Sequence, residues 1–115
     1  MTFLQIFLTI LCVIAISIGQ LLFKKTSIIL NQSNSIFSVQ VLGNLFLALF
    51  IYGIATIFWI YILKSVPLNK AYSFMALSFV FVTIGSFLLF NESINLQFIL
   101  GLFLIIIGLV FISNA

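Results

Sequence analysis

The chain has 115 residues, of which 65% are hydrophobic and 4% are charged, and its formal net charge is +3. Soluble domains carry about a quarter charged residues, so this composition indicates an integral membrane protein. Four lysines are too sparse for the basic surface that binds nucleic acid, and a chain with no histidine, one cysteine and one carboxylate has no set of metal ligands.

The first apolar run predicts a membrane-spanning helix over residues 3–23, which Lys24 and Lys25 close. About 20 helical residues cross a hydrocarbon core that is ~30 Å thick. Ser17, Gln20 and Lys24 recur at i, i+3 and i+7 and therefore share one face of this helix. A polar stripe against lipid is costly, so we expect this face to turn inward.

The longest connection runs over residues 26–40 and has a polar centre at residues 31–35. Its first part, residues 26–30, is expected to continue the first helix past the membrane surface. The second span is predicted over residues 41–63, and one of its faces carries Asn44, Ala48, Tyr52, Thr56 and Trp59. Trp59 and Tyr61 lie near its end, where they are typical of the aromatic belt at a membrane interface.

The segment Lys64–Tyr72 turns the chain back and divides it into two apolar hairpins. It contains the single proline of the chain, Pro67, which cannot donate a backbone hydrogen bond. We therefore expect a helix to stop before Pro67, and Asn69 to cap a new helix that starts near Lys70.

The third span is predicted over residues 71–90 and is interrupted by small and hydroxylated residues, namely Ser73, Ser78, Thr83, Gly85 and Ser86. Such residues let helices approach closely and hydrogen-bond to one another. The third span is therefore expected at the centre of the bundle.

The fourth span is predicted over residues 96–113, after a polar turn at residues 91–95 in which Asn95 can cap the helix. Gly101 and Gly108 lie seven residues apart on one face of it. This spacing predicts a groove for a partner helix.

Four spans place both chain ends on one side of the membrane, together with Lys64 and Lys70. Lys24, Lys25 and Glu92 lie on the other side. Two lysines on either side give no preferred orientation, so insertion both ways round and a topology fixed by a partner both remain open. No charge lies within a span, so a proton-coupled mechanism has no carboxylate at membrane depth.

The candidate substrate-binding residues are Ser17, Gln20, Lys24, Trp59 and Tyr72. The amide of Gln20 needs partners, either a neighbouring helix or a polar ligand. Lys24 could meet an anionic lipid headgroup, and the alternative is that it only reaches the lipid phosphates at the interface, as we expect of the other lysines. Tyr72 lies near the same surface as Trp59 and could line a headgroup pocket or anchor the interface. Glu92 is expected to have a structural role, favoured by the dipole of the fourth helix.

Three segments resemble signatures of the drug/metabolite transporter superfamily. Residues 18–25 resemble its Gly-Gln and lysine motif, residues 66–72 resemble its proline and Ala-Tyr loop, and residues 91–94 followed by 101–108 resemble its last hairpin. These segments occur in the expected order and cover nearly the whole chain. The four apolar runs themselves predict an all-α fold, an integral membrane bundle of four transmembrane helices, and the absence of a charge run, linker or low-complexity block predicts a single domain, residues 1–115.

Two small four-helix branches of that superfamily have this length. The small multidrug resistance proteins use a glutamate three residues before the matching glycine, and Ile16 occupies that position here. Residues 63–67 and 76–83 are more similar to the ArnE/ArnF-type flippase subunits, which move aminoarabinose-linked undecaprenyl phosphate and also lack the glutamate.

The resemblance implies a transporter or flippase subunit that moves a lipid-linked substrate, a polyprenyl (undecaprenyl) phosphate-linked sugar or related anionic lipid, across the bacterial inner membrane. Because the sequence offers no catalytic base, nucleophile or metal cluster, we expect no enzyme activity and no cofactor. Because one four-helix unit is thin for such a headgroup, a homodimer or a heterodimer with a similar small subunit is expected, with Gly101 and Gly108 at a helix contact. The alternatives are an exporter of small cations or metabolites and a noncatalytic accessory subunit. A site for aminoarabinose is expected to offer its amine an anionic group, and none lies at membrane depth.

Overall fold

The computed structural model describes residues 2–33 and 38–115, and over these residues it contains helices and turns only. The elements are α1 (Phe3–Ser33), α2 (Val39–Leu63), α3 (Leu68–Ser73), the short 3-10 helix η1 (Phe74–Ala76), α4 (Leu77–Phe90) and α5 (Leu96–Ser113). α3, η1 and α4 follow one another directly and form a third helical run, Leu68–Phe90. This run and the three long helices are each long and apolar enough to cross a membrane, which confirms the predicted all-α membrane fold.

The first helix is longer than its predicted span because it continues to Ser33. The expected continuation over residues 26–30 is therefore confirmed, while residues 34–37 of the predicted polar linker lie outside the described residues. A helix of 31 residues is about 46 Å long, whereas the hydrocarbon core measures ~30 Å. The part of α1 that follows Lys24 and Lys25 thus extends beyond the apolar span.

The turn around Pro67 differs from the sequence prediction. α2 ends at Leu63 as expected, but the next helix begins at Leu68, and Asn69 lies within its first turn rather than at its cap. The prediction for Asn69 is wrong because Pro67 takes the cap position with a φ of −58°, and its carbonyl oxygen accepts from the Ala71 N–H at 3.0 Å. A proline ring fixes this backbone angle in advance, so the helix starts without a side-chain cap.

The turn between α4 and α5 agrees with the prediction. Asn91 ends α4 in the left-handed conformation with a φ of 55°, which asparagine tolerates better than most residues. Asn95 caps α5, because its side-chain oxygen accepts from the Phe98 N–H at 2.8 Å. The polar turn thereby satisfies backbone groups that α4 and α5 leave open.

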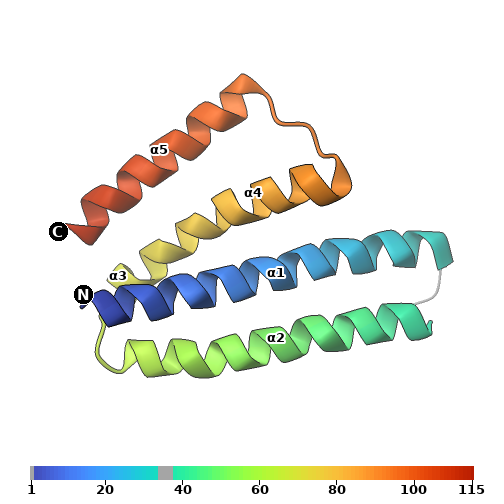
Figure 1. Ribbon diagram of the computed structural model, residues 1–115, viewed down its shortest axis with the longest axis horizontal. Coiled ribbons are helices and arrows are strands. Elements are labelled where there is room, and N and C mark those ends of the chain that lie inside the picture. The colour runs from blue at the N-terminus through green and yellow to red at the C-terminus, as the bar shows by residue number, and fades with distance from the viewer. Residues whose placement is uncertain (1, 34–37) are drawn as a thin grey trace.

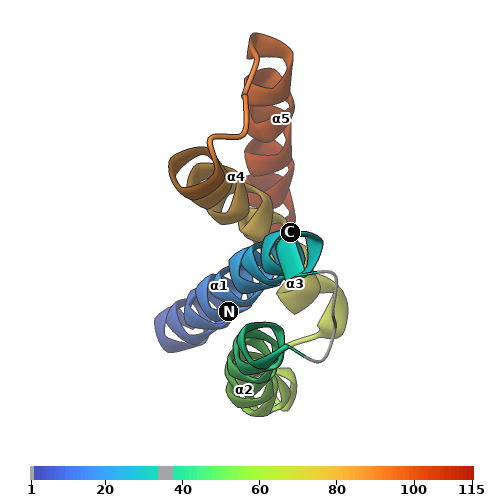
Figure 2. The same ribbon diagram turned by 90° about the vertical axis from the view of Figure 1, so that its right-hand side faces the viewer.

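The long helices stand in an open row in the order α2, α1, α4, α5 (Figures 1 and 2). The whole molecule accordingly measures 48 × 36 × 17 Å. α4 and α5 are close near the chain ends and diverge toward the turn at residues 91–95 (Figure 1). The prediction that the third span is central is wrong, because α1 packs against both α2 and α4 and has the largest buried share of the four spans.

The seam between α1 and α2 explains this central position. The buried residues of α2 recur every seven positions at Val41, Ala48, Ala55 and Ile62, which is the spacing of helices that cross at a small angle. Two of the four are alanines, so the α2 backbone can approach α1 closely. Cys12 of α1 is buried in this seam, with its Sγ 3.7 Å from the Ala55 carbonyl oxygen.

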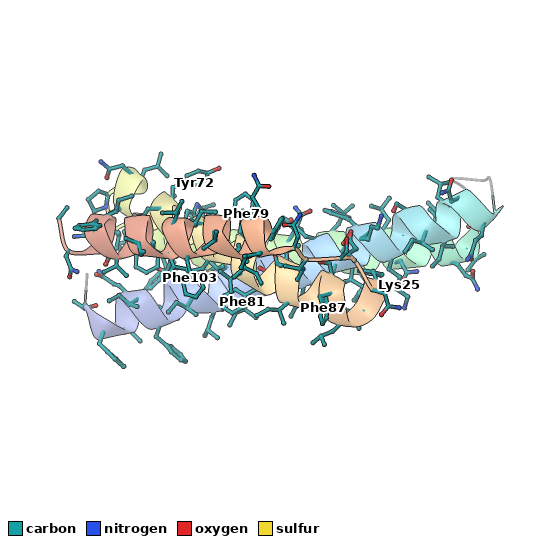
Figure 3. All side chains as sticks on the ribbon, turned by 90° about the horizontal axis from the view of Figure 1, so that it is seen from above. Lys25, Tyr72, Phe79, Phe81, Phe87 and Phe103 are labelled. Carbon is teal, nitrogen blue, oxygen red and sulfur yellow. The ribbon has the colours of Figure 1, made fainter. Side chains whose placement is uncertain are left out.

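Both chain ends lie at the same end of the molecule as the 64–67 turn, as predicted (Figure 1). Gln5 Nε2 donates to Ser65 Oγ at 2.9 Å, and Lys70 Nζ donates to the Ala115 carbonyl oxygen at 3.2 Å. Large apolar side chains cover the outside of the helices (Figure 3). Phe87 of α4 and Phe103 of α5 are 52% and 59% exposed, as suits surfaces that face lipid.

Candidate functional site

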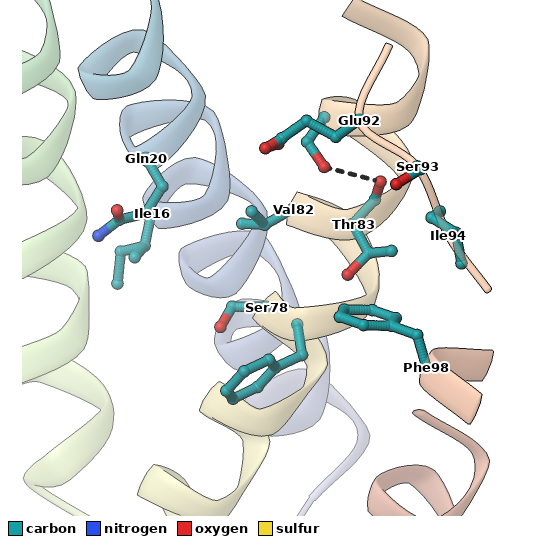
Figure 4. Close-up of a pocket in the computed structure, with 11 residues that line it drawn as sticks. Ile16, Gln20, Ser78, Val82, Thr83, Glu92, Ser93, Ile94 and Phe98 are labelled. Carbon is teal, nitrogen blue, oxygen red and sulfur yellow. Dashed lines mark hydrogen bonds between the residues drawn. The ribbon is translucent and has the colours of Figure 1, made fainter. Parts of the chain in front are cut away.

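A cavity of about 510 Å³, here named the headgroup cavity, lies between α1, α4 and the turn that leads into α5 (Figure 4). Its walls are apolar at Ile16, Phe79, Val82, Ile94 and Phe98. Its polar residues are Gln20, Ser78, Thr83, Ser86, Glu92 and Ser93. The cavity lies where α4 and α5 diverge, because its lining includes the turn between them and Phe98 of α5.

The serines of α4 offer mainly acceptor oxygens to the cavity. Ser78 Oγ donates to the Met75 carbonyl oxygen at 2.6 Å, and Ser86 Oγ donates to the Thr83 carbonyl oxygen at 3.1 Å. Each hydroxyl proton is thus used within the helix, while the lone pairs of the oxygen remain free. These side chains can therefore accept hydrogen bonds from a ligand.

Gln20 is held at the cavity wall by Tyr52 of α2. Gln20 Nε2 donates to Tyr52 Oη at 2.5 Å, which directs one N–H of the amide away from a ligand. The Tyr52 ring stacks on Phe23 with a centroid distance of 5.4 Å and an angle of 21° between the rings. It also lies over Gly19, where a Cβ would overlap the ring. The sequence placed Tyr52 on a face of the second span but could not indicate this pairing, which depends on the register of α1 against α2.

The five predicted binding residues do not form one site. Gln20 lines the headgroup cavity, and Lys24 is exposed one turn farther along α1. Ser17 is buried, and its Oγ donates to the Val13 carbonyl oxygen at 2.7 Å. Trp59 and Tyr72 come together instead in a second cavity of about 640 Å³, here named the aromatic cavity, which Leu68, Asn69 and Ser73 complete.

A third cavity lies between these two along the third helical run. It has a volume of about 470 Å³, lies between that run and α5, and shares the lining residues Ser78 and Phe79 with the headgroup cavity and Tyr72 and Ser73 with the aromatic cavity. Phe79, which is 58% exposed, thus lines both the third cavity and the headgroup cavity. The three cavities together follow the third run from the 91–95 turn toward the 64–67 turn.

Gly101 and Gly108 of α5 face open space in this chain. A Cβ built on either glycine would meet no atom within 4 Å, and Gly108 lines the third cavity. No helix of the described chain occupies the groove that their spacing predicts, so their role in a helix contact stays a prediction.

Several cavity residues carry roles that sequence reasoning did not assign. Ser78, Thr83 and Ser86 were expected to serve helix packing, and Glu92 was expected to be structural, yet all four line the headgroup cavity. Their spacing in the third span was a usable signal. The sequence did not indicate that these residues share a cavity with α1, because that depends on which helices are neighbours. Within residues 2–33 and 38–115, no group of three or more His, Cys, Asp or Glu side chains could hold a metal ion.

Comparison with known proteins connects this architecture to transport. The strongest curated matches include three proteins that share one description, "Probable 4-amino-4-deoxy-L-arabinose-phosphoundecaprenol flippase subunit ArnE". The protein from Enterobacter sp. (strain 638) is 34% identical over 66% of this chain and 71% of its own length. The protein from Escherichia coli O81 (strain ED1a) is 37% identical over 59% of this chain and 61% of its own length. The protein from Erwinia tasmaniensis is 34% identical over 54% of this chain and 57% of its own length.

No solved structure matches this chain. The model of the EamA-like transporter family, however, matches residues 1–114, which includes all four membrane-spanning runs and the headgroup cavity. This match confirms the resemblance to drug/metabolite transporters seen in the first helix, the proline loop and the last hairpin. Four apolar helices in a row, with a partly polar cavity between α1, α4 and the turn into α5, are thus the architecture of a member of the EamA-like transporter family, to which this chain belongs.

Proposed function

We propose that the protein is a flippase subunit that moves a polyprenyl phosphate-linked sugar across the bacterial inner membrane, acting as a transporter and not as an enzyme. The proposal takes residues 1–115 as one transmembrane domain. The names of its relatives support this substrate class. The observation that carries the proposal is the headgroup cavity, a polar pocket in an apolar bundle that adjoins the divergence of α4 and α5.

The physical problem of flipping is the passage of a polar headgroup through hydrocarbon. Moving an unpaired amide or hydroxyl from water into a medium that cannot hydrogen-bond costs roughly 4–8 kcal/mol. Acceptors at Gln20, Ser78 and Ser86 offset part of this cost for a sugar hydroxyl within the headgroup cavity. The lipid tail has no such cost and remains in the bilayer beside the helices.

The chain of cavities along the third helical run supports a path for the headgroup. The residues shared between neighbouring cavities are Phe79 with Ser78 at one junction and Tyr72 with Ser73 at the other. Every junction thus pairs one aromatic side chain with one hydroxyl. A sugar ring can stack on the aromatic face while its hydroxyls hydrogen-bond to the serine. In this path Trp59 and Tyr72 act at the far end. Ser17 has no part in it.

Lysines near both ends of this path suit a phosphate group. Lys24 and Lys25 follow the Gln20 turn of α1, while Lys64 and Lys70 flank the 64–67 turn. A phosphate attracts such side chains through charge-assisted hydrogen bonds, and an ammonium group near the membrane surface also attracts anionic lipids. A phosphate-linked lipid therefore meets cationic groups where it enters and where it leaves.

The loose packing of α5 supports assembly with a second copy of the chain or with a similar small subunit. α5 has the smallest buried share of the four spans, and Gly101 and Gly108 leave its surface open. A partner helix at these glycines would cover α5 and enclose the third cavity on that side.

Reconstitution into liposomes tests the proposed function. The protein is purified with any subunit that accompanies it and supplied with a polyprenyl phosphate-linked sugar, and the lipid that reaches the opposite leaflet is measured over time. We expect flipping above that of protein-free liposomes and several-fold slower flipping by Gln20→Ala. The matched control is Gln97→Ala, since Gln97 is an exposed glutamine on α5. A wild-type rate equal to that of empty liposomes would overturn the proposal.

A second candidate function is export of small cations, which the presence of Glu92 in the headgroup cavity favours. Ile16 is evidence against cation export, because this apolar side chain lines the cavity at the position where the small multidrug resistance proteins have their glutamate. Proton release on addition of tetraphenylphosphonium to purified protein distinguishes the two functions. We expect no release, and a stoichiometric release would favour the exporter.

A further inference from the structure

Glu92 is the single acidic residue of the chain, and it lines the headgroup cavity. It directly follows Asn91, the left-handed residue that ends α4, and its N–H donates to the Ser86 carbonyl oxygen at 3.4 Å. The backbone at the start of the turn is thereby held against the last turns of α4. Its side chain points toward α1 (Figure 4). A carboxylate therefore lies in the wall of a cavity proposed to receive an anionic lipid.

Two of the neighbouring hydroxyls have the same preference as this carboxylate. Ser78 and Ser86 use their hydroxyl protons within the third helical run, and Gln20 uses one of its two amide N–H groups on Tyr52. What the two serines leave for a ligand is acceptor oxygen. A carboxylate in the same cavity repels a phosphate and attracts a cationic donor such as a primary ammonium group.

A cationic side chain lies a short distance from this acceptor-lined pocket. Lys24 is four residues beyond Gln20 on the same face of α1, which is about 6 Å along the helix axis. It is exposed and can reach a phosphate at the membrane surface. Glu92 in the cavity wall and Lys24 one turn beyond Gln20 thus carry opposite charges.

The relatives are named for a phosphate-linked sugar that carries a primary amine. We infer that in this chain Glu92 is the residue that accepts the ammonium group of such a headgroup, and that Lys24 binds its phosphate. This inference rests on the proposed function and adds to it the residue that reads the amine. It also supplies the anionic group that the apolar spans lack, because the carboxylate reaches the cavity from the 91–95 turn.

A purely structural role for Glu92 makes a different prediction. Glu92 lies three residues before the cap of α5, where a negative charge also interacts favourably with the helix dipole. If that were its only role, loss of the charge would affect every lipid alike. Two lipids that differ only at the amine therefore separate the two roles.

The test measures binding of a short polyprenyl phosphate that carries a 4-amino sugar and of its N-acetylated copy, which has no positive charge. The protein is extracted from its own membrane in its native oligomeric state, and each lipid is titrated by native mass spectrometry at low salt. We expect the amine-bearing lipid to bind about three- to tenfold more tightly, as for a partly solvated charge-assisted hydrogen bond.

The variants assign this preference to the residues. Glu92→Gln should remove it while binding of the N-acetylated lipid stays unchanged, and Glu92→Asp should restore part of it. Lys24→Gln should weaken the binding of both lipids by the same factor. The neighbouring Lys25 points to a different side of α1, so Lys25→Gln should weaken their binding less. A circular dichroism melt of each variant shows whether the fold is intact.

The outcomes distinguish this inference from the function on which it rests. Equal binding of the two lipids by the wild-type protein, or an equal loss of both in Glu92→Gln, overturns the role of Glu92 and leaves the flippase proposal standing. If the wild-type protein binds neither lipid, the flippase proposal falls, and the role of Glu92 falls with it.

Discussion

Because Gly19 has no side chain, the Tyr52 ring can lie beside it, near the cavity wall. The Tyr52 ring occupies the space beside Gly19 and from there accepts the hydrogen bond from Gln20. Sequence reasoning predicted that the Gln20 amide needs a partner, and the neighbouring helix supplies one. It could not identify Tyr52 as that partner, because the apolar residues on all sides of α1 and α2 allow several registers between them.

Gly19→Ala is expected to destabilise the protein. The added Cβ would overlap the Tyr52 ring, and moving the ring breaks both its stacking on Phe23 and the hydrogen bond from Gln20. Overpacking of this kind costs about 1–3 kcal/mol. Thermal unfolding in detergent measures the loss, and Gly53→Ala is the matched control because a Cβ there meets nothing within 4 Å. Equal melting temperatures for the two variants would contradict this account of Gly19.

Tyr52→Phe should leave the fold intact and slow flipping. It keeps the ring over Gly19 and removes the hydroxyl that holds Gln20, which frees the amide to turn in the cavity. A neutral hydrogen bond contributes about 0.5–1.5 kcal/mol, so we expect a rate roughly two- to tenfold lower in the liposome assay. Tyr61→Phe is the control, since Tyr61 is 63% exposed and lies near the C-terminal end of α2, whereas Tyr52 lies in its middle. A wild-type rate for Tyr52→Phe would show that Gln20 needs no fixed orientation.

At the scale of elements, the helix boundaries were predictable where a side chain sets them. Asn95 caps α5 as its position suggested, because its oxygen reaches the Phe98 N–H. Asn69 does not cap α3, because the backbone of Pro67 already starts that helix. The extent of α1 was only partly predictable, since helix and membrane span are different properties. The polar residues after Lys25 end the span without ending the helix.

Gly108→Leu on α5 is expected to weaken assembly without unfolding the chain. The position has open space around it in the single chain, so a larger side chain is tolerated there, but it fills the proposed contact with a partner helix. The fraction of dimer in mild detergent, measured by native mass spectrometry, should fall several-fold. Gly43→Leu on α2, which also has open space around it, should leave that fraction unchanged. If Gly108→Leu keeps the wild-type dimer fraction, the partner does not bind at this face.

For the whole molecule, hydropathy predicted four spans and a shared side for both chain ends, because about 20 consecutive apolar residues have few alternatives to crossing a bilayer. It did not predict the open row of helices. Helices that are apolar on nearly all sides give little signal for which face meets a neighbour. The α1–α2 pair in the order α2, α1, α4, α5 is explained by small residues of α2 that permit close approach. The cavities depend on this order, and for that reason the residues of the third run were predictable as polar positions but not as the wall of a shared site.

The balance of lysines predicts that a change of charge on one side sets the orientation of the whole molecule. Two lysines, Lys24 and Lys25, lie toward one membrane surface, and Lys64 and Lys70 lie toward the other. Since loops rich in lysine stay on the cytoplasmic side, the double variant Lys24→Gln/Lys25→Gln should place the 64–67 turn and the C-terminus in the cytoplasm. The double variant Lys64→Gln/Lys70→Gln should do the opposite.

Reporters fused to the C-terminus, one active only in the cytoplasm and one only outside it, measure the two populations. Identical reporter ratios in both double variants would mean that a partner subunit, and not the charge of this chain, sets its orientation.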